Sequence, residues 1–578
     1  MEKILRINTR TLEYKFEGVS DDLAYLGGRA FTSRIIRQEV PPRTHPLGRE
    51  NKLVIAPGIL TGTPVVNSGR ISVGAKSPLT GGIKESNAGG TLSQKLAKLG
   101  IKAVILEDKP ENKSKPKVVF INKDGVAIEK VPELEGRGTY RSAERLFERY
   151  GDKVAIMVIG PAGEDLRLGA SIQFTDPKGR PARAAGRGGL GAVMGSKGIK
   201  AIVVDDTGGA GVEIADKETF KAASKRWTEI LQGHPVTSEG LPSLGTAILI
   251  KIINEAGALP TKNFRYGRFD KAEEVSGEKM VEIIEKRGGV VKEGCHPGCI
   301  IQCSQAYVDE KGEYITSGFE YETIWALGPN TTISDLDDLA VLDRMCDDLG
   351  LDTIEMGNTI AVAMEGGLIP WGDGKAAIQL LKRVYNKEDY LGKIIANGAS
   401  FTGKAFGVER VPVVKGQSLP AYDPRAVKGV GVTYATSPMG ADHTAGYAVC
   451  QNILKVGGDI DPLKKEGNVE VSKNLQIATA AIDSTGLCLF VAFAVLDTED
   501  AMDTIAKLIS AKTGKQINVE DLIKLGISVL KDEYSFNYDA GFTKNQDQLP
   551  EFFLKEKFPP HNTVWDFTID ELQAAKVL

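Results

Sequence analysis

The first 205 or so residues alternate short apolar runs with glycine and proline, a pattern typical of β-strands joined by tight turns. The clearest predicted strands are the β-branched runs at 52–56, 103–106, 118–121, 154–159 and 199–204. Glycine clusters at 81–82, 89–90 and 186–191 separate some of these runs. The segment 205–211 (DDTGGAG) has the composition of a linker.

Beyond this linker the apolar residues recur every three to four positions, which predicts helices. The first begins near Asp216, with acidic residues at its start. Further helices are predicted at 279–287, 336–349, 376–385, 474–482 and 501–513. A second break falls at 416–424. We therefore predict an α+β protein with a β-rich domain at 1–210 and two mainly α-helical domains at 211–417 and 418–578.

Composition narrows the class of protein. The 578 residues are 42% hydrophobic, enough for a sizeable core, and 72 basic against 76 acidic residues argue against nucleic-acid binding driven by bulk charge. Apolar runs such as 488–495 (CLFVAFAV) are too short to span a bilayer, and the N-terminal segment has no apolar signal core. Six cysteines make no disulfide framework. We expect a cytoplasmic protein.

Three of the six cysteines lie close together, as C-x3-C-x3-C at Cys295, Cys299 and Cys303. Thiolates at this spacing can share a metal centre, and we favour an iron–sulfur cluster. Such a cluster needs a fourth thiolate from elsewhere in the chain. The candidates are Cys346, Cys450 and Cys488. Structural zinc, and simple packing as small buried side chains, stay open as alternatives.

Two short segments repeat one pattern. The segments 347–352 (DDLGLD) and 483–488 (DSTGLC) both read D-x-x-G-L-x, and both follow a predicted helix. A pair of matching loops in two domains is what a pseudo-symmetric ligand would need.

The run 186–191 (GRGGLG) matches the G-x-G-x-x-G dinucleotide pattern only formally, because 195–198 (GSKG) interrupts any helix after it. We expect its backbone amides, and those of 87–90 (NAGG), to approach an anionic group such as a phosphate. Arg183, Arg187 and Lys197 would assist by charge. Tight turns without any ligand are the alternative interpretation.

Two kinds of residue are candidates for proton transfer. His443 lies in a polar, glycine-bounded loop, 440–446, where an imidazole can exchange protons near neutral pH. Glu320 and Glu322 precede an apolar run that would raise the pKa of a carboxyl group, but their spacing does not choose between them. A hydrogen-bonded loop histidine and a solvated acidic face are the alternatives. His234 stands beside a proline and is predicted at the surface.

Together these segments resemble the tungsten-containing aldehyde:ferredoxin oxidoreductase family. The resemblance runs along nearly the whole chain. It rests on SGRISVGAKSPLTGG from Ser68, NAGG from Asn87, RAAGRGGLGAVMGSK from Arg183, FEYETIWALG, CDDLGLDT, LPAYDPR from Leu419 and DSTGLCLF.

The resemblance implies a tungsten (or molybdenum) bis-pterin, a [4Fe–4S] cluster and a magnesium ion joining the pterin phosphates. It implies that the cluster ligands are Cys295, Cys299, Cys303 and Cys488. Arg70 would bridge cluster and pterin, and the backbone carbonyls of Asn87 and Ala184 would meet the magnesium hydration shell. The other cofactor-binding positions it implies are Ala88, Gly89, Arg183, Gly186, Asp347, Asp352, Asp483 and Leu487.

The implied activity is oxidation of aldehydes to carboxylic acids by Glu322 and His443, with electrons leaving through the cluster to ferredoxin or a polyferredoxin-like small subunit. There are two alternatives. In one, the same cofactor scaffold serves as the ring-reducing subunit of a larger complex. In the other, the protein is a non-catalytic iron–sulfur electron carrier or a zinc protein. Either a homo-oligomer or a hetero-oligomer is compatible with the resemblance.

Four departures from the family pattern stand out. An extra residue separates Cys295 from Cys299, Ala445 replaces a lysine, and Asp442 precedes the histidine. The E-x-x-H of an intersubunit metal site aligns with Val341 and Arg344, so we expect that metal to be absent.

Overall fold

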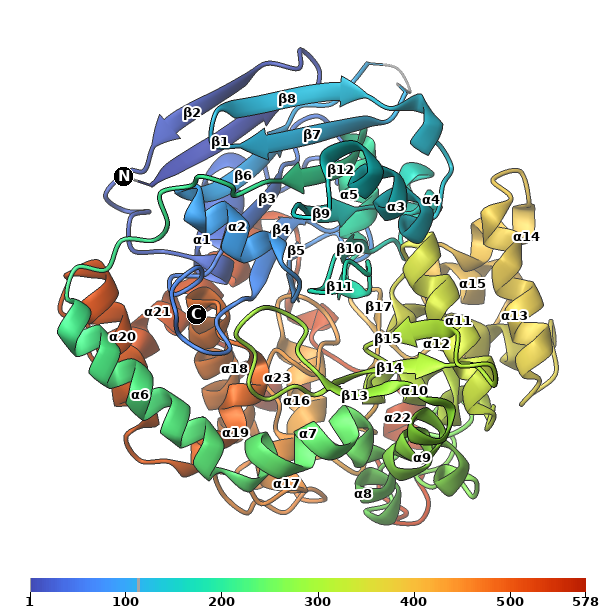
Figure 1. Cartoon of the computed structure of the whole chain (residues 1–578). Helices are drawn as coiled ribbons and strands as arrows, with labels where there is room; N and C mark the ends of the chain where they lie inside the picture. The colour runs from blue at the N-terminus through green and yellow to red at the C-terminus, as the bar shows by residue number, and fades with distance from the viewer. Residues whose placement is uncertain (1, 112–114, 578) are drawn as a thin grey trace.

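The computed structural model describes residues 2–111 and 115–577, and its N-terminal part contains two six-stranded mixed sheets (Figure 1). The first has the order β2-β1-β6-β3-β4-β5, with β1 (Lys3–Asn8), β2 (Tyr14–Gly18), β3 (Leu53–Pro57), β4 (Ile71–Lys76), β5 (Ile83–Ala88) and β6 (Ile101–Glu107). The second has the order β11-β10-β9-β12-β7-β8, with β7 (Lys117–Asn122), β8 (Gly125–Lys130), β9 (Ala155–Val158), β10 (Ile172–Phe174), β11 (Arg183–Ala185) and β12 (Ile199–Val204). The prediction of a β-rich first part is confirmed.

One apolar core joins the two sheets. It takes Val104 from β6 and Ile202 from β12, both almost fully buried, together with residues of the helices between them. The five predicted strands correspond to β3, β6, β7, β9 and β12, because β-branched runs suit strands that are buried on both faces. Strand β5 is an edge strand of the first sheet, and β11 is an edge strand of the second. The two strands contact each other near the centre of the molecule (Figure 1).

The rest of the chain is mainly helical. The helices are α1 (Gly28–Glu39), α2 (Leu92–Lys98), α3 (Thr139–Tyr150), α4 (Pro161–Glu164), α5 (Leu190–Ser196), α6 (Lys217–Gly233), α7 (Leu241–Leu244), α8 (Leu249–Glu255), α9 (Gly277–Arg287), α10 (Tyr321–Leu327), α11 (Leu336–Leu349), α12 (Thr353–Glu365), α13 (Gly374–Lys382), α14 (Tyr390–Ile395), α15 (Gly398–Phe406), α16 (Lys428–Thr436), α17 (Val449–Asn452), α18 (Asn468–Thr485), α19 (Ala492–Asp497), α20 (Ala501–Thr513), α21 (Val519–Asp539), α22 (Glu551–Lys555) and α23 (Ile569–Gln573). Smaller sheets are formed by β13 (Val290–Glu293), β14 (Ser304–Val308) and β15 (Tyr314–Ser317), and by β16 (Val413–Val414) with β17 (Gln417–Ser418).

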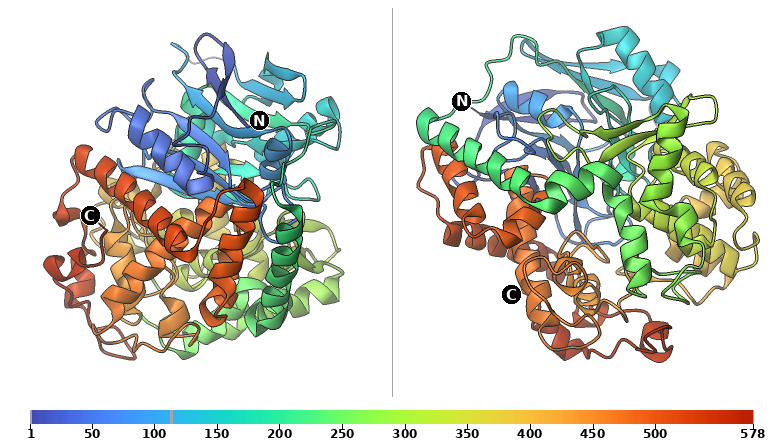
Figure 2. Two further views of the ribbon diagram at one scale, coloured as in Figure 1. Left: turned by 90° about the vertical axis from the view of Figure 1, so that its left-hand side faces the viewer. Right: turned by 60° about the horizontal axis from the view of Figure 1, so that its bottom comes forward.

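Segments distant in sequence pack side by side. Figure 2 shows the helical part below the two sheets, with α6 against α20. Helix α1 packs on β4 at one side and on α18 and α21 at the other, so it joins the first sheet to the C-terminal helices. The division of the chain at 210 and 417 stays our proposal.

Two expectations about local structure were wrong. A short helix, α5, does follow the 186–191 loop. The strand before the loop, β11, pairs antiparallel with β10, whereas the strand before a dinucleotide-binding loop lies in a parallel sheet. His234 is buried, because it ends α6 and its Nε2 lies 3.1 Å from the carboxylate of Asp497.

Among the described residues, one stretch, Val236–Glu255, has the length and mean hydropathy of a membrane span. It is divided into four short helical segments, since Leu244 leaves the helical region and Gly245 has a φ of +62°. Less than half of it is buried, and it is weak support for a span.

Candidate active site

The edge strands β5 and β11 bring the two predicted glycine-rich segments together. Asn87 and Ala88 end β5, and Arg183 and Ala184 lie on β11. Ala184 is exposed although both of its neighbours are buried. The carbonyl of Asn87 accepts a hydrogen bond from Arg70 at 3.2 Å. Because a carbonyl has two lone pairs, this bond leaves Asn87 one position for a water of a metal hydration shell.

The two D-x-x-G-L-x loops occupy equivalent places on the two sheets. Each begins in the last turn of a helix, α11 or α18, and the helix is followed by a glycine with positive φ: Gly350 at +69° and Gly486 at +86°. Each glycine meets a glycine that follows a sheet strand. A Cβ on Gly160, after β9, would lie 2.1 Å from the carbonyl oxygen of Leu349, and one on Gly58, after β3, would lie 2.1 Å from the nitrogen of Gly486.

Backbone hydrogen bonds complete these contacts. Ile59 and Leu60 donate to the carbonyls of Ser484 and Thr485 at 3.1 and 2.8 Å, and Ser171 donates to that of Gly350 at 2.8 Å. The sequence repeat is therefore a structural repeat, with one loop seated on each sheet.

The aspartates that head the loops differ in their electrostatic surroundings. Burial raises the pKa of Asp483 to about 6, and Arg29, 3.3 Å away, opposes that rise. Burial together with the nearby Asp343 raises the pKa of Asp347 well above its ordinary value. A neutral carboxyl group can donate as well as accept a hydrogen bond, so the two loops offer a bound heterocycle different partners.

Four cysteines from two distant segments lie in one neighbourhood. The pKa of Cys299 is raised by a hydrogen bond with Cys295, by burial and by the charges of Cys303 and Cys488. Within the described parts of the chain, no three His, Cys, Asp or Glu side chains converge where a single metal ion would sit. Cys346 and Cys450, the two other candidates for a fourth ligand, are buried core residues.

Cationic groups surround the first of these thiols. The hydrogen bond from Cys299 lowers the pKa of Cys295 well below its ordinary value, and His296, Arg70 and Arg183 lower it further. A Cβ on Gly89 would lie 3.0 Å from Cys295 Sγ and 3.3 Å from an Arg70 guanidinium nitrogen. Arg70 therefore lies between the cysteine cluster and the Asn87 strand, and a side chain at Gly89 would be a tight fit against both neighbours.

The structure pairs Glu322 with His443. Nε2 of His443 lies 3.3 Å from Oε1 of Glu322, in a geometry that makes no hydrogen bond. Glu322 Oε1 and His443 Nδ1 are both buried without a hydrogen-bond partner, while Glu322 Oε2 accepts from the backbone of Ala421 at 3.0 Å. Glu320 instead accepts from Thr246 at 2.6 Å and does not face the histidine.

Burial sets the protonation of this pair. It raises the pKa of Glu322 to about 8, and Asp442 and Asp352 add to the rise. It lowers the pKa of His443 to about 4, and Arg187 and Lys84 contribute to that decrease. Between these values Glu322 holds a proton and His443 is neutral, so the pair carries one proton that can be given up or moved.

The loop of His443 is fixed from the β-rich part of the chain. Lys84 on β5 forms a buried ion pair with Asp442 at 2.8 Å. Arg187 donates to the carbonyl of Ala441 at 2.7 Å, and its Nε lies 3.3 Å from Asp352. Burial alone would raise the pKa of Asp442, but Lys84 and Arg187 hold it far below its ordinary value. Asp352 also caps α12 through the amide of Ile354.

Some predicted contacts are absent, and some contacts were not predicted. Lys197 turns away from the glycine-rich loop and donates to the carbonyls of Gly48 and Asn51. No role in the site was predicted for Lys84, Arg29 or Asn67. The only signal for Lys84 was a charged residue between two glycine-rich motifs.

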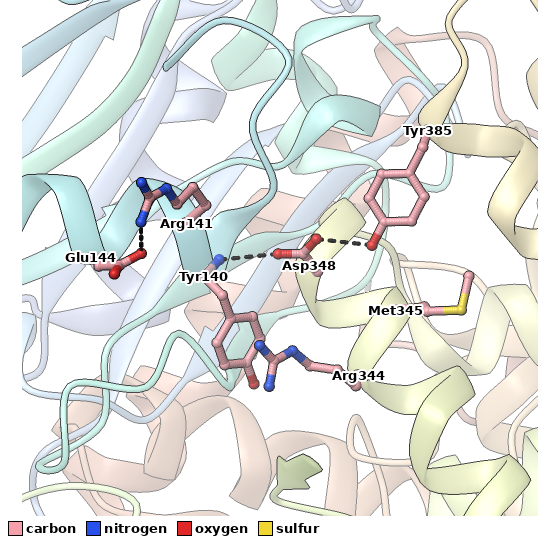
Figure 3. Close-up of a pocket in the computed structure, with 7 residues that line it drawn as sticks. All are labelled: Tyr140, Arg141, Glu144, Arg344, Met345, Asp348 and Tyr385. Atoms are coloured by element: carbon pink, nitrogen blue, oxygen red, sulfur yellow. Dashed lines mark hydrogen bonds and ion pairs between the residues drawn. The ribbon is translucent and has the colours of Figure 1, made fainter. Parts of the chain in front are cut away.

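A surface cavity of about 480 Å³ lies beside the first loop (Figure 3). Its lining includes Arg344, whose guanidinium stacks 3.3 Å from the ring centroid of Tyr140, and Asp348, which accepts from Tyr385 at 2.8 Å. Arg344 also donates to the carbonyl of Ile315. Both partners of Arg344, the ring of Tyr140 and the carbonyl of Ile315, thus belong to this chain.

Two matched loops, four clustered thiols and a buried carboxylate–imidazole pair are the features of a cofactor-dependent oxidoreductase. Family models described as aldehyde ferredoxin oxidoreductase, N-terminal domain, and aldehyde ferredoxin oxidoreductase, domains 2 and 3, match residues 4–206 and 222–574. The chain belongs to the aldehyde ferredoxin oxidoreductase family and is an oxidoreductase.

Relatives cover nearly the whole chain. The tungsten-containing aldehyde ferredoxin oxidoreductase of Pyrococcus furiosus is 36% identical, over 96% of this chain and 92% of the relative, and that of Thermococcus kodakarensis is equally similar. The WOR-like subunit of an aliphatic sulfonate oxidoreductase from P. furiosus is 27% identical over 77% of this chain and 75% of its own length. The active-site complex BamBC of benzoyl coenzyme A reductase has the same fold, with a TM-score of 0.80, 20% identity, and coverage of 96% and 92%.

Proposed function

We propose that this chain binds a tungsten bis-pterin between its two sheets and a [4Fe–4S] cluster beside it. The tungsten assignment is supported by the relatives named for that metal. The two equivalent loops, headed by Asp347 and Asp483, suit two near-identical pterins. Asn87 and Ala184, on the contacting strands β5 and β11, would meet the magnesium ion through their carbonyls.

Four thiols in one neighbourhood suit a cubane cluster held by Cys295, Cys299, Cys303 and Cys488. Arg70 and Arg183 would balance the negative charge that thiolates and cluster bring to a buried site. A reducing compartment such as the cytoplasm would keep these thiols available.

The proposed reaction is RCHO + H₂O → RCOOH + 2 H⁺ + 2 e⁻. When bound, the tungsten–pterin group supplies the two-electron redox chemistry. Glu322 takes a proton from the water that attacks the carbonyl carbon, through its unpartnered Oε1. Neutral His443, whose Nε2 lies 3.3 Å from Glu322 Oε1, holds the substrate or its developing oxyanion by a hydrogen bond. The Glu322–His443 pair is the observation that carries this assignment.

Electrons would leave one at a time through the cluster to a ferredoxin or a ferredoxin-like subunit. The relatives' names support ferredoxin as the acceptor, and the WOR-like relative, which is named as a subunit, supports a partner chain. The fold shared with BamBC makes a larger reductase the second candidate function. Aldehyde oxidation by the isolated, metal-loaded chain would favour the first function, and activity only within a complex would favour the second.

The test is the variant Glu322→Gln, purified anaerobically beside the wild type. The amide keeps the shape of the side chain but is not a base, so we expect aldehyde oxidation to fall by at least about 100-fold. Elemental analysis should find about one tungsten and four irons in both proteins, the ratio set by one bis-pterin and one cubane cluster. Full activity in the loaded variant would refute the role of Glu322, and wild-type protein without tungsten or molybdenum would refute the cofactor assignment.

A further inference from the structure

Asn67 lies at the junction of the two cysteine-bearing segments. It is completely buried and adopts a φ of +60°, a left-handed conformation that asparagine tolerates better than most residues. Its backbone N–H donates to the carbonyl of Gly298 at 3.0 Å, and its backbone carbonyl accepts from the N–H of Cys488 at 2.9 Å. One residue thus connects the loop of Cys299 to the segment of the fourth cysteine.

The side chain of Asn67 adds two contacts to the same loop. Oδ1 accepts from the amide of Ile300 at 3.1 Å, and Nδ2 donates to Sγ of Cys299 at 3.4 Å. The amide of Ile300 can only donate, so the oxygen of Asn67 must face it and the NH₂ group must face the sulfur. The orientation of the carboxamide is therefore decided by its partners.

Cys299 Sγ receives one further donor. The backbone amide of Gln302 lies 3.4 Å from it, while the Gln302 side chain is exposed. Of the two N–H groups on this sulfur, the Asn67 group belongs to a side chain and can be removed by substitution. The Gln302 group stays in place whatever side chain that residue carries.

We propose that Asn67 is a positioning residue for the iron–sulfur cluster, which holds the Cys299 and Cys488 segments together and raises the cluster's reduction potential through its N–H···S bond. This inference rests on the proposed function, because it requires the cluster. Reduction places additional negative charge on the cluster and its thiolate ligands, and a hydrogen-bond donor stabilises that charge. Loss of the donor therefore makes the cluster harder to reduce.

The test compares the cluster's midpoint potential, followed by EPR of the reduced holoenzyme, in wild type, Asn67→Gly and Gln302→Ala. Glycine accepts the positive φ, so only the side-chain contacts are lost. We expect Asn67→Gly to retain four irons and to shift the reduction equilibrium about tenfold toward the oxidised form, about 59 mV for a one-electron couple. Gln302→Ala, which keeps its backbone donor, should match the wild type.

Asn67→Asp provides a second variant in case glycine loosens the loop and iron is lost. An aspartate keeps the acceptor for Ile300 but has no N–H for the sulfur, and its charge opposes reduction, so its midpoint should fall below that of the wild type. An unchanged midpoint in a variant that retains four irons would overturn the inference while leaving the proposed function intact. A wild-type protein with no cluster would overturn both.

Discussion

Substitution of Lys84 by methionine tests whether the β-rich part of the chain holds the His443 loop in place. Nζ of Lys84 lies 2.8 Å from Oδ2 of Asp442, and both side chains are almost completely buried. Methionine keeps the apolar stem, which is packed so closely that a Cβ on Gly188 would lie 2.5 Å from Lys84 Cγ. The substitution therefore removes one charge and little volume.

The size of the effect follows from the geometry. Two unit charges at 2.8 Å attract by about 6 kcal/mol at an effective dielectric constant of about 20. Breaking a buried pair by removing one partner costs about 3–5 kcal/mol, because the other charge stays buried. Asp442 Oδ1 still binds the amide and hydroxyl of Thr444, and Arg187 still binds the carbonyl of Ala441, so the loop loses one of its external anchors and keeps its internal turn.

Hydrogen exchange of the holoenzyme, read by mass spectrometry on peptides covering 439–447, measures this local opening directly. A loss of about 3–5 kcal/mol corresponds to exchange about 200- to 5,000-fold faster. The double variant Lys84→Met/Asp442→Asn should recover most of the protection, since neither charge remains. Lys524→Met, which removes an exposed pair with Glu520, is the control and should change nothing.

Protection in Lys84→Met within threefold of wild type, or no recovery in the double variant, would refute this reasoning.

Two further expectations concern the active site and the cluster. If Glu322 acts as the base, its carboxyl group must be ionised, and burial raises its pKa to about 8. The rate of aldehyde oxidation should therefore increase about tenfold per pH unit below pH 8 and level off above it. A rate that is flat from pH 6 to 9 would contradict this role. Cys488→Ser should lose at least one of about four irons, whereas Cys450→Ser, whose thiol lies in the same apolar cluster, should keep them all; equal iron contents would remove Cys488 from the ligand set.

Local patterns predicted several of the elements. The ranges 336–349 and 501–513 coincide with α11 and α20, since each has an apolar stripe of helical period and ends before a glycine of positive φ. The repeat at 347–352 and 483–488 was visible as a string of residue types, and each copy begins in the last turn of a helix. Spacing alone also identified the three clustered cysteines.

The sequence by itself determined the α+β class, the paired loops and the residue types of the site. Residue spacing did not choose between Glu320 and Glu322, the family resemblance implied Glu322, and the tertiary structure shows that Glu322 faces His443. Only the tertiary structure decided that β5 and β11 meet and that Asn67 and Lys84 anchor the functional loops. These are contacts between residues tens to hundreds of positions apart. Whether a charge or an amide is buried with a partner depends on which distant elements pack around it. The local periodicity of the sequence carries no information about that packing.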